Sequence, residues 1–85
     1  MEPVEEKVQE ILLEILDIKE GDITPSASFV DDLGATSIDM VEIVTALQNT
    51  FDVDISESEV ARLRTVQDTV SFLKAAITQK NAGAS

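Results

Sequence analysis

Apolar residues recur at helical spacing in three separate stretches of this 85-residue chain, and no stretch alternates long enough to carry a sheet. The first stretch forms one wide apolar stripe of six residues: Val4, Val8, Ile11, Leu12, Ile15 and Leu16. A chain of this length has room for only one hydrophobic core. The pattern therefore predicts one all-α domain.

A long irregular segment follows the first stripe. Pro3 suits a first helical position and Gly21 lies past the stripe, so we expect a first helix near 3–17. Residues 20–35 then form a loop rich in Gly, Pro, Ser and Asp, and a loop of this length in so small a domain is often functional. Its apolar residues should pin it over the core: Ile23, Phe29, Val30 and Leu33.

Hydroxyl and carboxylate residues three positions apart mark the starts of the remaining helices. Thr36 with Asp39 resembles a capping box and predicts a second helix near 37–51. Its expected apolar face consists of Met40, Val41, Ile43, Val44, Leu47 and Phe51. Two further pairs of this spacing, Ser56 with Glu59 and Thr65 with Asp68, predict a short helix near 57–62 and a last helix near 67–79.

The residue types that the chain lacks exclude several classes of site. It has no cysteine and no histidine, which excludes disulfides, thiolate-ligated metals, a thiol nucleophile and the usual base of a catalytic triad. It has no Trp or Tyr and only three Phe, so a base-stacking platform is excluded as well. We therefore predict no metal site and no catalytic residue.

The net charge of −11 is concentrated in the middle of the chain. Residues 20–61 contain ten acids and no base. Such a polyanion is repelled by nucleic acid and by anionic membranes, so we expect partners with basic patches. No apolar run reaches the roughly 18 residues of a membrane span, and the acidic, periodic N-terminus does not resemble a signal peptide. We expect a cytoplasmic protein.

Ser37 stands at the expected start of the second helix, at the end of a loop that contains Gly34. Two interpretations of this serine are open from the residues alone. It can be a nucleophile, but the chain offers only Lys and carboxylates as bases, and the nearby acids oppose an alkoxide. It can also be simply a good residue for a helix start.

The segment 32–42, with the sequence DLGATSIDMVE, resembles the signature of acyl carrier proteins and of the wider phosphopantetheine carrier family. The usual pattern there is Asp-Leu-Gly-x-Asp-Ser-Leu, followed by an acidic or similar residue and then x-Val-Glu. Residues 23–29, 51–55 and 65–68 also resemble the corresponding family segments, and the similarity covers about residues 4–78 in order.

The resemblance implies a four-helix bundle with three long helices, a short third helix and a long first loop. It implies that a separate phosphopantetheinyl transferase, with Mg²⁺, moves 4′-phosphopantetheine from coenzyme A onto the Ser37 hydroxyl. The covalent arm then holds an acyl group as a thioester, and the protein itself is not an enzyme. The acyl carrier domain would span residues 1–80, with a flexible tail at 81–85.

The resemblance also implies where partner enzymes bind. They would be acyl-transferring or synthase enzymes of fatty acid, lipid or polyketide-type synthesis, with basic docking surfaces, and they would meet a monomer. The expected partner-binding residues surround Ser37 and follow it along the second helix: Asp32, Thr36, Ile38, Asp39 and Glu42.

The chain departs from the family pattern at several positions. Thr36 replaces the usual Asp before the serine, Ile38 replaces Leu, and Arg62 and Arg64 place positive charge beside the short helix. These departures favour a specialised member of the family over a housekeeping fatty-acid carrier. Two alternatives stay open: an aminoacyl or peptidyl carrier, and an unmodified interaction module that has kept the fold.

Overall fold

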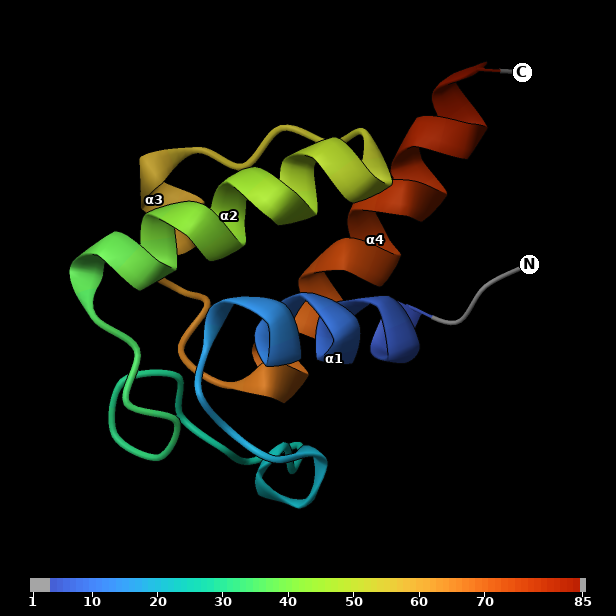
Figure 1. Cartoon of the computed structure of the whole chain (residues 1–85). Helices are drawn as coiled ribbons and strands as arrows, with labels where there is room; N and C mark the ends of the chain where they lie inside the picture. Colours follow the sequence, from blue (N-terminus) through green and yellow to red (C-terminus); the bar gives the residue numbers. More distant parts are fainter. Residues whose placement is uncertain (1–3, 85) are drawn as a thin grey trace.

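The computed structural model describes residues 4–84, with side chains described as far as Gln79. Figure 1 shows α1 (Val4–Ile15), the short 3₁₀ helix η1 (Glu20–Asp22), α2 (Ser37–Phe51), α3 (Glu57–Val60) and α4 (Val66–Ala84). No strand occurs within residues 4–84. The predicted all-α fold, with three long helices, a short third helix and a long first loop, is confirmed.

The hydrophobic core lies where α1 meets α2 and α4. Its fully buried side chains come from these three helices and from the first loop: Val8, Leu12, Phe29, Ile43, Leu47, Thr69 and Leu73. Thr69 is the polar member of this set, and its hydroxyl donates a hydrogen bond of 3.2 Å to the Thr65 carbonyl. The core therefore buries this hydroxyl without leaving it unsatisfied.

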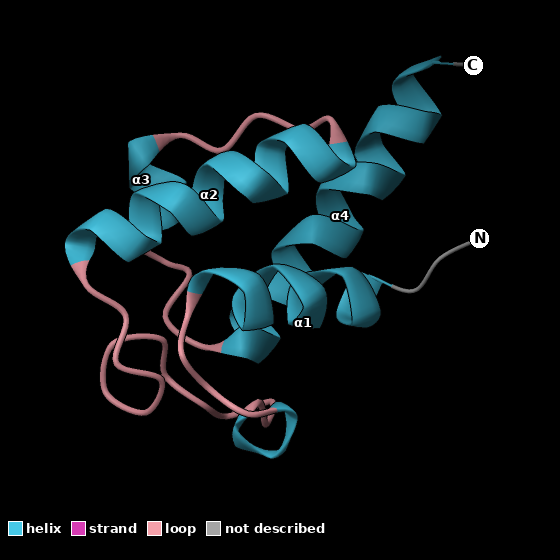
Figure 2. Cartoon of the chain, viewed as in Figure 1, coloured by secondary structure: helices cyan, strands magenta, loops and turns pink. Residues whose placement is uncertain are grey.

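The long first loop, pink between α1 and α2 in Figure 2, is fastened to the segment that precedes α4. The Phe29 amide donates to the Arg64 carbonyl at 3.0 Å, and the Val66 amide donates to the Ala27 carbonyl at 3.1 Å. Phe29 also anchors the loop in the core with its side chain. This double attachment fixes the position from which α2 begins.

Three of the four loop residues expected to face the core do so, and the fourth does not. Ile23, Phe29 and Leu33 are buried, whereas Val30 is 60% exposed. The Leu33 amide closes a turn onto the Ser28 carbonyl at 2.9 Å. Within that turn Phe29 and Leu33 point inward, and Val30 is rotated toward solvent.

The helix ends differ from the predicted bounds by a few residues. The first helix ends at Ile15 rather than near 17. The short helix ends at Val60 rather than near 62, because the chain turns immediately after it. The second helix has the predicted bounds of 37–51.

The last helix is longer than predicted, since α4 begins at Val66 and continues to Ala84 rather than ending near 79. No proline follows to stop it, and Ala82 favours helix. Residues 1–3 and Ser85 lie outside the described part of the chain, so the expected helix start at Pro3 is not described. The division into a domain of residues 1–80 and a flexible tail of residues 81–85 stays a prediction.

Candidate functional site

A capping box fixes the start of α2. The Asp39 amide donates a hydrogen bond of 3.1 Å to the Thr36 hydroxyl, and the Thr36 amide donates one of 3.0 Å to the Asp39 carboxylate. This arrangement satisfies backbone donors that a helix end otherwise leaves without partners. The local sequence therefore determines where the helix begins, and it places Ser37 as the first helical residue.

Ser37 is exposed, and its hydroxyl makes no hydrogen bond with any described residue. The backbone amides of Ser37 and Ile38 have no acceptor within the helix, because the residues four positions earlier belong to the loop. Unpaired amides at the positive end of a helix dipole favour an anion such as a phosphate. The position thus combines an accessible hydroxyl with amides that suit a phosphodiester attached to it.

The loop before α2 brings Asp32 to the same end of the helix. The Ser28 amide donates to the Asp32 carboxylate at 2.7 Å, so this side chain holds the turn together. Gly34 follows with a φ of +71°, in the left-handed region that favours glycine. The tight turn and Gly34 together position the backbone at Thr36, immediately before α2 begins.

The two other acids predicted to bind partners differ in what holds them. Asp39 is half-buried and is engaged in the capping box. Glu42 is exposed, four residues after Ile38, and its side chain has neither a hydrogen bond nor an ion pair within the described part of the chain. Of the predicted acids, Glu42 is therefore the one free to meet a partner without disturbing the fold.

Exposed apolar side chains adjoin Ser37. Ile38 is 72% exposed and Val41 is 66% exposed. Placing Val41 on the buried face of the second helix is therefore wrong. The sequence does contain a signal that Val41 is exposed, because the residues four positions before and after Val41 are the polar Ser37 and Thr45. Exposed large apolar groups of this kind mark interaction surfaces when they lie together.

A cavity of about 420 Å³ opens beside the first turn of α2. Its lining includes Met40 of α2, Phe29 and Val30 of the loop, and Val60, Leu63 and Arg64 from α3 and the segment after it. Met40 is three residues after Ser37, so the cavity begins within one helical turn of the serine. Neither Val30 nor Arg64 was among the predicted site residues.

No helix within the described residues is long and apolar enough to cross a bilayer.

A helical bundle that presents an unbonded serine at a helix start, with a cavity beside it, has the geometry of a carrier for a tethered group. Residues 6–73 match the family described as "Phosphopantetheine attachment site". The chain is also 45% identical over 74 residues to acyl carrier proteins of Buchnera aphidicola subsp. Acyrthosiphon pisum, in the strains Tuc7, 5A and APS. Each match covers 87% of this chain and 92% of the relative.

The chain therefore belongs to the phosphopantetheine-binding acyl carrier protein family. Proteins of this family carry 4′-phosphopantetheine covalently, and they are carriers rather than enzymes. They interact with synthase and transferase enzymes. The predictions of the family, the carrier function and the cofactor are confirmed.

Proposed function

We propose that Ser37 is the residue to which 4′-phosphopantetheine is attached, and that the protein carries acyl groups on this arm. The observation that carries the proposal is the exposed, unbonded Ser37 hydroxyl at the N-terminus of α2, within the region that matches the family. The arm supplies a terminal thiol that holds an acyl group as a thioester. The chain has no cysteine, so this thiol would be the only one on the loaded protein.

The residues of this chain would position the arm in two ways. The free amides of Ser37 and Ile38 would hold the phosphodiester close to the helix end. The cavity that starts at Met40 offers an apolar shelter for the first part of the cargo, because Phe29, Val60 and Leu63 line it.

Partner enzymes would meet a docking surface formed by Asp32, Thr36, Ile38, Asp39 and Glu42. Its acids would attract basic groups and speed association, in a manner that salt weakens. The exposed Ile38 would add apolar contact next to the attachment site. These features suit brief encounters of a cytoplasmic monomer with the enzymes of fatty acid, lipid or polyketide-type synthesis.

The test is the intact mass of the protein after incubation with coenzyme A, Mg²⁺ and a broad-specificity phosphopantetheinyl transferase. Wild type should gain the mass of one arm, located on the peptide that contains Ser37. Ser37→Ala should gain nothing and keep its helical circular dichroism, because alanine is a good helix residue. Ser71→Ala, at an exposed position of α4, is the matched control and should load like wild type. Loading of Ser37→Ala would refute the assignment.

A further inference from the structure

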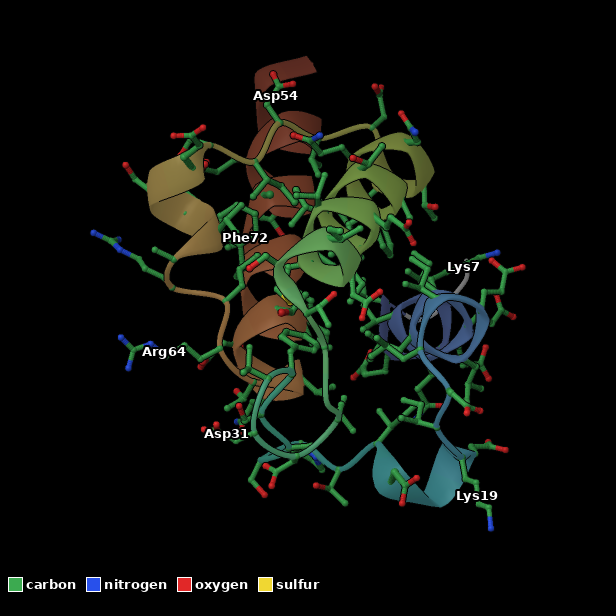
Figure 3. The ribbon with its side chains drawn as sticks, turned by 60° about the vertical axis from the view of Figure 1, so that its left-hand side comes forward. Lys7, Lys19, Asp31, Asp54, Arg64 and Phe72 are labelled. Atoms are coloured by element: carbon green, nitrogen blue, oxygen red, sulfur yellow. The ribbon has the colours of Figure 1, made fainter. Side chains whose placement is uncertain are left out.

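Arg64 is held at a fixed place in the fold by its backbone. Its carbonyl accepts the Phe29 amide at 3.0 Å, and the next residue, Thr65, forms an isolated antiparallel bridge with Ser28. The preceding residue, Leu63, is buried in the core. The side chain of Arg64 therefore projects from a rigid point rather than from a mobile loop, and Figure 3 shows it extending away from the body of the molecule.

Arg64 also differs from several other bases in the contacts that its side chain makes with acids. Three bases have an acidic neighbour: Lys7 with Glu10, Lys74 with Glu5, and Arg62 with Glu59. The Arg64 guanidinium has no hydrogen bond or ion pair with any side chain that the structure describes. An unpaired, solvated cation is available to a partner at little desolvation cost.

The cavity beside α2 connects Arg64 to the proposed attachment site. Met40 and Arg64 line the same cavity, and Met40 is one turn after Ser37. The exposed Val30 and the acid Asp31 line it too, and Figure 3 shows Asp31 on the same side of the molecule as Arg64. An enzyme that covers Ser37 and this cavity would therefore also contact Arg64.

We propose that Arg64 selects among partner enzymes by charge. The matching partner presents a carboxylate opposite Arg64 and basic groups opposite Asp39 and Glu42. A partner whose contact surface is basic throughout is repelled by Arg64, even though the acids of α2 attract it. Specificity of this kind needs a repulsive element against the wrong partner as well as attraction to the right one. The inference rests on the proposed function, because it assumes that enzymes dock around Ser37.

The first experiment uses a transferase that meets α2 with basic groups, chosen because Glu42→Gln slows its loading of this protein. Initial loading rates are measured by intact mass at low ionic strength. Arg64→Glu should load roughly fivefold faster than wild type, since a charge contact in water is worth about 1 kcal/mol. Arg64→Gln should change the rate in the same direction and by less. The gains should shrink as salt shortens the Debye length from about 30 Å to about 8 Å.

Lys19→Glu is the matched control, because it makes the same change in net charge at an exposed lysine. Figure 3 shows Lys19 beside η1, at the opposite side of the view from Arg64. This variant should load at the wild-type rate. An equal gain in loading rate for Lys19→Glu and Arg64→Glu would mean that only the net charge matters, and it would overturn the proposal. A loading rate for Arg64→Glu at or below that of wild type would also overturn the proposal.

The second experiment tests the attractive half of the proposal by charge exchange. Each Lys or Arg on the docking face of the same transferase is changed to Glu, one at a time. One such variant should load wild type faster than Arg64→Glu, which reverses the order found with the unmodified enzyme. A double-mutant cycle then isolates the pair from other effects. If no transferase variant reverses the order, then no carboxylate opposite Arg64 attracts it, and the attractive half of the proposal is wrong. A protein that takes up no arm at all would instead refute the function itself.

Discussion

Thr36 and Asp39 hold each other in place at the start of α2, since each side chain accepts the other residue's backbone amide, at 3.1 Å and 3.0 Å. Asp39 therefore has a structural role besides any role in docking. Replacing it would remove a helix cap, which is typically worth about 1 kcal/mol. Asp32 is engaged in the same way by the Ser28 amide. Glu42 is therefore the acid of the proposed docking surface whose removal should leave the fold unchanged.

Glu42→Gln should slow loading by a basic transferase severalfold at low ionic strength and leave the melting temperature unchanged. The Glu42 side chain is exposed and has no hydrogen bond or ion pair within the described residues, so its effect on stability should be close to zero. Loss of one attractive charge lowers the rate of encounter. The measurement is the initial rate of arm transfer by intact mass.

Glu14→Gln provides the control for Glu42→Gln. Glu14 is an exposed acid near the end of α1, outside the docking surface, so this variant should load like wild type. Equal rates for Glu42→Gln and Glu14→Gln would remove Glu42 from the docking surface.

The capping residues show which parts of the fold are encoded locally. The bounds of α2 follow from Thr36 and Asp39 alone, because the hydrogen bonds of a capping box join residues three positions apart. The exposure of Val30 and Val41 is not encoded in that way. Apolar periodicity assigns such residues to the core, and it does not distinguish them from apolar residues that stay exposed to water.

The position of Arg64 beside the proposed attachment site could not be predicted from local sequence either. The position of Arg64 depends on the hydrogen bond that the Phe29 amide of the first loop donates to the Arg64 carbonyl. It also depends on the burial of the Phe29 side chain in the core. This hydrogen bond joins residues that are far apart in the sequence, so no pattern among neighbouring residues predicts it. The sequence alone indicates only that Arg64 is a positive charge that departs from the family pattern.

Acidification should destabilise the protein in part through Glu59. The Ser56 amide donates to the Glu59 carboxylate at 2.9 Å and, with the Ser56 hydroxyl and the nearby Arg62, holds the pKa of Glu59 below its usual value of 4.5. A carboxyl whose pKa is lower in the folded state stabilises that state above its unfolded pKa. This stabilisation is lost as the pH falls from about 4.5 through the folded pKa.

Glu59→Gln should therefore flatten the fall of the melting temperature between roughly pH 5.5 and pH 3.5. Protonation of other acids also relieves repulsion in this range, so the informative quantity is the difference between wild type and variant. Glu57→Gln removes an exposed acid of the same helix and serves as the control. Parallel curves for wild type and Glu59→Gln would show that Glu59 is not coupled to folding.

Salt should raise the melting temperature near neutral pH. Residues 20–61 contain ten acids and no base, so like charges are concentrated in this segment. Screening by added salt weakens the repulsion among these acids. Melts at about 0.01 M and about 0.15 M NaCl test this, and an unchanged midpoint would mean that the acids are too far apart to interact.

Thr36→Asp should raise the rate at which a generalist transferase loads the protein, by roughly twofold or more. The substitution restores the acid that the family usually has before the modified serine. The cap is retained, because an Asp carboxylate can accept the Asp39 amide as the Thr36 hydroxyl does. A further negative charge beside Asp32 and Asp39 adds repulsion of a few tenths of a kcal/mol, which the better cap offsets. The melting temperature should therefore barely change.

Thr36→Asn separates charge from shape in this comparison, since it keeps the capping acceptor and adds no charge. It should load at the wild-type rate, whereas Thr36→Asp should load faster, and the difference should fade as salt is added. This outcome would mean that Thr36 lowers recognition by generalist enzymes, consistent with the selection by charge that we assign to Arg64. If wild type loads as fast as Thr36→Asp, then Thr36 is a neutral replacement, and the case for a specialised carrier rests on the remaining departures at Ile38, Arg62 and Arg64.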